Sequence, residues 1–188
     1  MTKTIDCGGT PVAIRPFAHA DATSVASFAQ SLPEHDLLFL SRDIKHARVI
    51  EAWRDAIASG EIESLIATTV GDGAETVVGT TAIVRDPLGW SPHVAEIRLL
   101  VSPTMRGKGL GRALLDASMT LAREAGATKF MARMTPDQRG AITLFEEAGF
   151  RGEAMLRDQV CGRDGQFHDL AILSCDVARA DAKRDAFA

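Results

Sequence analysis

Apolar and polar residues in the first third of the chain follow patterns that predict a strand and then two helices. Residues 12–17 alternate as in a short strand, and apolar positions recur at helical spacing after Asp21, a residue type that caps helices. A second helix is expected over residues 43–59, with Gly60 at its end. Between the helices, residues 32–41 hold polar and apolar residues in blocks. This segment is interpreted either as a packed connection or as a lip that faces a substrate.

Strand patterns follow in the middle of the chain. Residues 63–70, 76–84 and 93–101 are separated by turns rich in Gly, Asp and Pro, which predicts an antiparallel meander. Apolar residues then recur every three or four positions over residues 110–125, which predicts a long amphipathic helix that ends at Gly126.

The last third of the chain returns to strands around one more helix. A strand is expected over residues 128–134 and a helix over 136–149, and residues 155–161 and 166–175 are predicted to pair as a long hairpin. With no internal repeat, these elements predict one α/β domain over residues 10–175. Residues 176–188 are expected to form a frayed tail.

Composition narrows the function classes. The 188 residues are 24% charged and 46% hydrophobic, as in one soluble domain, and no apolar run is long enough for a membrane span or a signal core. We therefore expect a cytoplasmic protein with no membrane partner. The formal net charge of −4 gives no broad electrostatic footprint for nucleic acid. The three Cys are widely spaced, so neither a disulfide framework nor a metal site is predicted. The chain has no Tyr, which excludes any mechanism that needs a phenol.

Glycines and cations gather at the start of the long helix. The glycines would let a ligand approach the backbone closely, and the first amides of the helix point outward at the positive end of the helix dipole. The cations would surround a bound phosphate or pyrophosphate. The glycines are Gly107, Gly109 and Gly111, and the cations are Arg106, Lys108 and Arg112.

Two common phosphate-binding motifs do not fit this loop. A P-loop needs Gly-Lys followed by Ser or Thr, whereas Lys108 is followed by Gly109. A dinucleotide fingerprint needs GxGxxG directly after a strand and an acid about 20 residues later. The spacing here is GxGxG, and residues 128–130 carry no acid.

Two segments resemble motifs of the Gcn5-related N-acetyltransferase superfamily. The acetyl-coenzyme A signature of that family, Arg/Gln-x-x-Gly-x-Gly/Ala, is matched by Arg106-x-x-Gly109-x-Gly111. The run that begins at Gln138 and ends at Phe150 is similar to the family's Asn-x-x-Ala-x-x-Leu-Tyr segment and the Gly-Phe that follows it. The motifs come in the family's order and on the elements where they belong, so the resemblance covers about residues 10–175.

The resemblance implies a fold and a co-substrate. The fold would be a central mixed, mostly antiparallel sheet with helices on both faces and a coenzyme cleft where two strands splay apart. The co-substrate would be acetyl-CoA, its pantetheine amides pairing with the backbone of the strand before the loop and its pyrophosphate lying on the loop. The implied coenzyme-binding residues are Leu99, Leu100, Val101, Arg106, Gly107, Lys108, Gly109, Leu110, Gly111, Arg112 and Gln138.

The implied activity is direct acetyl transfer to a primary amine of a small molecule or a protein. Glu96 is the candidate base, acting on the amine directly or through water. Because Glu96 shares a strand face with Arg98, the alternative is an ordinary ion pair. His93 could act as base nearer neutrality, but its place at a strand entrance favours a turn. His168 and Asp169 are adjacent on a strand and point to opposite faces, which argues against a direct pair.

Two positions depart from the family pattern. Gln138 stands where the family often has Asn, and Phe145 stands where many members have the Tyr that protonates the leaving thiolate. The proton must then come from water, from the amine or from another side chain. A non-catalytic coenzyme A sensor is therefore the alternative function, and an acyltransferase for longer acyl groups is a third. The sequence decides neither the identity of the acceptor amine nor whether the protein forms a homodimer.

Overall fold

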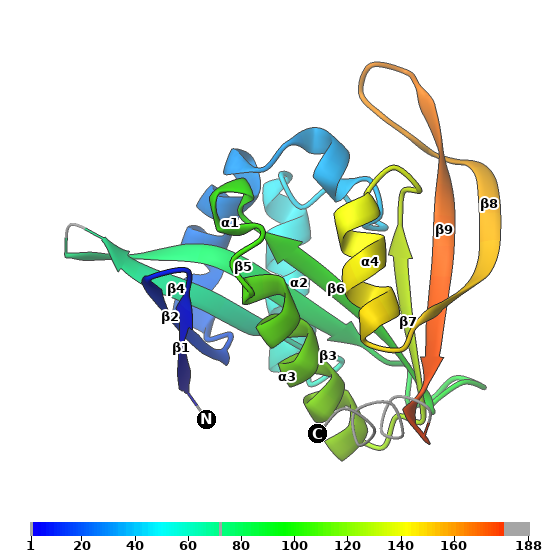
Figure 1. The fold of residues 1–188 in the computed structure, drawn as a ribbon, viewed down its shortest axis with the longest axis horizontal. Coiled ribbons are helices and arrows are strands. Elements are labelled where there is room, and N and C mark those ends of the chain that lie inside the picture. The colour runs from blue at the N-terminus through cyan, green and yellow to red at the C-terminus, as the bar shows by residue number, and fades with distance from the viewer. Residues whose placement is uncertain (1, 72, 179–188) are drawn as a thin grey trace.

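A single open sheet organises the chain (Figure 1). The structure, a computed structural model, describes residues 2–71 and 73–178. Across these residues the sheet has nine strands. Eight run in the order β1-β2-β4-β5-β6-β7-β9-β8, and the ninth, β3, pairs with β5. All neighbours are antiparallel except β6 and β7, which are parallel. The strands are β1 (Lys3–Cys7), β2 (Thr10–Pro16), β3 (Ile62–Glu63), β4 (Leu65–Gly71), β5 (Ala74–Val84), β6 (Val94–Val101), β7 (Lys129–Met134), β8 (Arg151–Cys161) and β9 (Phe167–Asp176).

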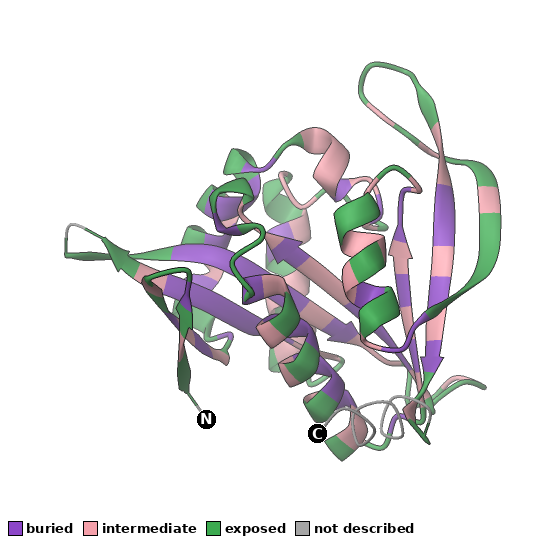
Figure 2. Cartoon of the chain, viewed as in Figure 1, coloured by how far each residue is buried: buried purple, intermediate pink, exposed green. Residues whose placement is uncertain are grey.

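Helices cover both faces of the sheet, which confirms the predicted α/β fold class. Apolar residues of α1 and α2 pack with Leu100 on one face, while those of α3 and α4 pack with Ile97 and Leu99 on the other. Figure 2 shows the buried residues concentrated in the central strands and the inward helix sides. The helices are α1 (Ala22–Ser31), α2 (Ala47–Ala58), α3 (Leu110–Glu124) and α4 (Arg139–Glu147), with short 3-10 turns η1 (His19–Asp21), η2 (Glu34–Leu37) and η3 (Pro103–Met105).

The parallel strands β6 and β7 separate part of the way along their length. Their ladder runs from Val94 opposite Lys129 to Glu96 opposite Met131 and is not continued in the described residues. On its other side, β6 stays paired with β5 as far as Val101 opposite Gly79. The edge of β6 that faces β7 therefore has backbone groups without ladder partners beyond Glu96.

Several element boundaries differ from the sequence prediction. The second helix, α2, begins at Ala47 and not near residue 43. The carboxylate of Asp43 accepts a hydrogen bond from the Lys45 amide at 2.9 Å, which favours a turn, and His46 Nδ1 caps the helix by accepting from the Arg48 amide at 3.3 Å. Strand β1, before residue 10, was not anticipated and pairs with β2.

The C-terminal hairpin is longer than expected but keeps the predicted pairing. Strand β8 begins at Arg151, four residues before the predicted start. Cys161 lies opposite Phe167, as the turn position predicted, and the thiol of Cys175 donates to the carbonyl of Asp176 at 3.2 Å. Of the expected tail, residues 179–188 lie outside the described part of the chain. No helix in the described part is long and apolar enough to cross a membrane.

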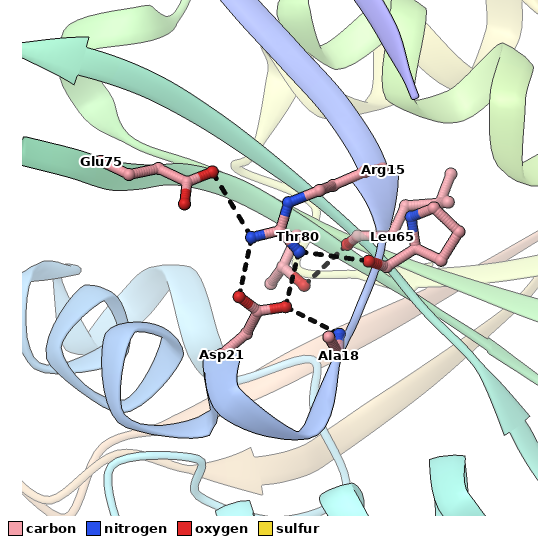
Figure 3. Close-up of polar contacts among 7 residues, drawn as sticks. Arg15, Ala18, Asp21, Leu65, Glu75 and Thr80 are labelled. Carbon is pink, nitrogen blue, oxygen red and sulfur yellow. Dashed lines mark hydrogen bonds and ion pairs between the residues drawn. The ribbon is translucent and has the colours of Figure 1, made fainter. Parts of the chain in front are cut away.

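Asp21 joins β2 to α1 in a way that corrects its predicted role as a helix cap. It precedes α1, but its side chain makes no capping hydrogen bond to that helix. Its carboxylate instead accepts two hydrogen bonds from Arg15, at 2.7 and 2.8 Å, and one from the Ala18 amide at 2.7 Å (Figure 3). Hydrogen bonds from Arg15 lower the pKa of Asp21, and this effect outweighs the rise that burial alone would cause.

Asp21→Asn is expected to destabilise the fold by roughly 1.5–3 kcal/mol at neutral pH, the range for hydrogen bonds to charged groups. Because the folded-state pKa of Asp21 is lowered, the stabilisation is present above its unfolded-state pKa, about 4, and is lost as the pH falls through the lowered value. Urea unfolding of both proteins from neutral to acid pH should show the difference shrink. Glu75→Gln is the control, since Glu75 is half exposed and 3.4 Å from Arg15. An equal loss in both variants would contradict the assignment.

Candidate functional site

The loop between β6 and α3 presents free backbone amides at a helix start. The backbone turns through left-handed conformations at Gly107 (φ +71°) and Gly109 (φ +84°), and Gly109 is the N-cap of α3. Its carbonyl accepts the first helical hydrogen bond from Ala113 at 3.1 Å. A Cβ on either glycine would meet no described atom within 4 Å, so the space above them is open. This geometry suits an anion that approaches the backbone.

A cleft of about 890 Å³ extends from this loop along the separated strands. It is bounded by the end of β6, the end of β7, α4 and the segment around η2. The structure brings most of the predicted coenzyme residues together along it. Those that line it are Leu99, Leu100, Val101, Arg106, Gly107, Gly109, Gly111, Arg112 and Gln138.

Two predicted coenzyme residues do not line the cleft. Leu110 is fully buried in the core beneath α3, because the first turn of the helix points it toward the sheet. The stem of Lys108 lies against the turn between β1 and β2, with its Cγ 3.2 Å from the place a Cβ on Gly8 would take. Gly111 lines the cleft but also serves packing, since a Cβ there would lie 3.1 Å from Leu144 Cδ2 on α4.

Acidic side chains hold two of the predicted cations at the rim. Arg106 pairs with Asp36 of η2 at 2.5 Å, and Arg112 lies 3.5 Å from both Asp116 and Glu147. A bound phosphate would compete with these carboxylates for the guanidinium groups. Two further arginines line the cleft and were missed by sequence reasoning, Arg133 on β7 and Arg139 at the start of α4. Only Arg139 carried a signal, because it follows Gln138 in the second motif.

Glu96 lies at the point where β6 and β7 separate, but it is enclosed. Its side chain is only 9% exposed. Arg98 donates to both of its carboxylate oxygens, at 2.9 and 3.3 Å, and Arg133 lies 3.5 Å from Oε2. Glu96 is not among the residues that line the cleft, whereas Arg133 is. The ion pair with Arg98 is thus present, and the role of Glu96 as base stays a prediction.

The structure also places His93, His168 and Asp169, which the sequence singled out. His93 is exposed in the turn before β6, at the end of the strand away from the glycine loop, where its carbonyl accepts from the amides of Thr128 and Lys129. Asp169 accepts from the backbone amide of Asp158 at 2.9 Å, as expected of a side chain not paired with His168.

Residues 32–41 serve as both a packed connection and a border of the cleft. Leu37 is buried in the core, while His35 and Asp36 line the cleft. His35 Nε2 lies 2.6 Å from Asp137 Oδ2 and 3.4 Å from the hydroxyl of Thr135. Partial burial alone would raise the pKa of Asp137, but hydrogen bonds from Thr135 and the Asp137 backbone, together with His35, hold that pKa below its ordinary value. Sequence reasoning missed His35, because its partner lies about a hundred residues away.

A smaller hollow of about 350 Å³ lies under α2 on the other face of the sheet. Apolar side chains of α2 line one side, Thr80, Thr81 and Ala82 of β5 line another, and Arg98 reaches it from β6. Leu100 lines both this hollow and the cleft, so the two spaces approach each other at β6.

Relatives with similar sequences are acetyltransferases. The N-acetyltransferase 8F1 of Rattus norvegicus is 33% identical over 84 residues, 44% of this chain and 38% of that protein. The IAA acetyltransferase of Azospirillum brasilense is 35% identical over 94 residues, 50% of this chain and 58% of that protein. The matched part is therefore less than two thirds of the length of these relatives.

Solved structures share the fold. The yncA protein of Salmonella typhimurium, solved with its cofactor acetyl-CoA, superposes with a TM-score of 0.71 over 88% of this chain and 94% of that chain, at 21% identity. At this identity the likeness concerns the fold alone. The model of the Acetyltransferase (GNAT) family matches residues 32–150, more than half of the sequence, and the chain therefore belongs to that family.

Proposed function

We propose that the protein transfers an acetyl group from acetyl-CoA to a primary amine by direct attack. The observation that carries this proposal is the open edge of β6 beyond Glu96, which leads directly into the glycine loop at the start of α3. Pantetheine amides need unpaired backbone groups, and a pyrophosphate needs outward amides with nearby cations. The cleft supplies the unpaired backbone groups and the outward amides with their cations along one path, which supports acetyl-CoA as the co-substrate.

The residues of the cleft account for binding and polarisation. Bound there, acetyl-CoA would supply the thioester to be attacked. The backbone of residues 99–101 would orient the pantetheine arm, and an N–H in this stretch would polarise the thioester oxygen. The amides of residues 109–112 would hold the pyrophosphate, with Arg106 and Arg112 released from their acidic partners. The hollow under α2, which shares Leu100 with the lining of the cleft, would be a route for the acceptor amine.

Glu96 is proposed to accept the amine proton through water, since Arg98 and Arg133 separate its carboxylate from both spaces. A Cys intermediate is not part of the proposal. Among the described residues, the lining of the cleft includes none of the three cysteines, Cys7, Cys161 and Cys175.

Amine screening with acetyl-CoA tests the activity. Small amines, amino acids, polyamines and peptides would be incubated with the protein and acetyl-CoA, and free thiol followed beside mass analysis of the products. We expect thiol release that depends on one class of amine and matches the acetylated product in amount. If no amine raised thiol release above the buffer rate, the proposal would be wrong.

A coenzyme A sensor is the second candidate, favoured by one observation. Phe145 takes the position where many family members have a catalytic Tyr, and its ring is buried, edge-on to Phe150 at 4.9 Å between centroids. The sensor would bind acetyl-CoA without turnover. The variant Phe145→Tyr separates the two candidate functions. A sensor would show turnover only in this variant, whereas an enzyme would show turnover in the wild type as well.

A further inference from the structure

The leaving thiolate needs a proton, and the cleft contains no phenol to give one. The chain has no Tyr, and Phe145 presents only a hydrocarbon ring to the cleft. Coenzyme A thiolate is a tolerable leaving group, since a thiol of this kind resembles free Cys with a pKa of about 8.5. A proton donor would still speed its departure, and general acid catalysis typically contributes about 10²–10⁴-fold.

Among the described residues that line the cleft, His35 is the one imidazole, the side-chain type that most often serves as a general acid or base. The lining arginines carry guanidinium groups, which serve as cations and hydrogen-bond donors and not as general acids. The lining carboxylates are already engaged, Asp36 with Arg106, Glu147 with Arg112 and Asp137 with His35 itself. No Lys, Cys or second His is part of that lining, as far as the structure describes the chain.

The surroundings of His35 suit an imidazolium. Its Nε2 faces the Asp137 carboxylate at 2.6 Å, and a carboxylate at this distance stabilises the charged ring. The hydroxyl of Thr135, just after β7, lies 3.4 Å from His35, and the His168 ring on β9 meets the His35 ring edge-on with centroids 5.3 Å apart.

The neighbours of His35 on its own segment are paired elsewhere. Glu34 accepts from the Arg163 backbone at 2.7 Å, and Asp36 pairs with Arg106. The one charge placed directly on the ring by another described element is thus the carboxylate of Asp137, whose pKa is lowered.

We propose that His35, oriented by Asp137, donates the proton that the leaving thiolate takes up, directly or through one water molecule. This inference rests on the proposed acetyl transfer. The amine nitrogen bonds to the acyl carbon as the carbon–sulfur bond breaks, and sulfur keeps the electron pair. The imidazolium then gives its proton to sulfur. The proton lost by the amine passes through Glu96 and water to solvent, and His35 regains its proton from solvent.

The pH profile of kcat in His35→Gln tests the donor role, because Gln keeps a hydrogen-bonding amide but cannot titrate. A donor must be protonated, so the wild type should lose activity on the alkaline side. The variant should be about 10²-fold slower, near the lower end for general acid catalysis, and should lack this alkaline decline. Acetyl-CoA affinity measured by calorimetry should be unchanged, and free imidazole should partly restore turnover in His35→Ala. The matched control is His168→Gln, which alters the neighbouring ring outside the cleft and should keep the decline.

Three results would overturn the inference. In the first, His35→Gln keeps the wild-type rate and pH profile. In the second, the variant loses the decline in rate on the acid side of the profile, as expected if His35 were a base. In the third, His168→Gln and not His35→Gln loses the alkaline decline. Each of these leaves acetyl transfer by the wild type intact. A wild type that acetylates no amine would instead overturn the proposed function, and the role of His35 with it.

Discussion

Gly109→Asp is expected to abolish detectable acetyl-CoA binding while the chain stays folded. Gly109 is the N-cap of α3 with φ +84°, in open space beside the amides proposed to hold the pyrophosphate. A carboxylate there would repel the pyrophosphate and occupy its site. Calorimetric titration with acetyl-CoA measures the loss, and circular dichroism reports the fold. Gly111→Asp is a weaker test, because a side chain at Gly111 would first press on Leu144.

Gly60→Asp is the matched control for this variant. Gly60 also has a left-handed backbone, φ +80°, and a Cβ added there would meet nothing within 4 Å, but it follows α2 away from the cleft. Both variants should carry a similar strain of about 1–2 kcal/mol, so their stabilities should fall alike. Only Gly109→Asp should lose the coenzyme. Wild-type affinity in Gly109→Asp would remove the loop from the site.

Glu96→Gln is expected to lower turnover by about 10²–10⁴-fold, the range for a lost general base. The loss should be largest at low and neutral pH, where the acceptor amine is mostly protonated, and should diminish as the pH rises. Steady-state kinetics over pH, with the acceptor found by screening, measures it. Acetyl-CoA affinity should persist, because Glu96 does not line the cleft.

Glu153→Gln is the control for Glu96→Gln. Glu153 pairs with Lys129 at 2.8 Å on the same sheet but is exposed, so its replacement should leave the rate unchanged. A Glu96 variant that keeps the wild-type rate across the pH range, yet unfolds at a lower temperature, would show that Glu96 only holds Arg98 and Arg133 in place.

Much of the fold was predictable because its signals are local. Apolar periodicity placed α3 and its end at Gly126, and the glycine spacing placed the loop at the start of that helix. The alternation along β6 correctly separated Glu96 and Arg98 from Ile97 and Leu99, since successive residues of a strand point to opposite faces.

Features that depend on distant partners could not be predicted. Arg15 binds the carboxylate of Asp21, which therefore makes no capping hydrogen bond to α1. The carboxylate of Glu96 is enclosed by Arg133 as well as by Arg98. The pair of His35 with Asp137 joins two loops that come together only when η2 reaches the start of α4. Strand β1 carries too few apolar residues to stand out before it pairs with β2.

The most direct test of the account is a crystal structure of the protein with acetyl-CoA. The account predicts the pyrophosphate on the amides of residues 109–112, with the pantetheine arm hydrogen-bonded to residues 99–101 between β6 and β7. It also predicts the sulfur within reach of His35, directly or through one water. Coenzyme bound elsewhere, or sulfur screened from His35 by ordered protein, would contradict it.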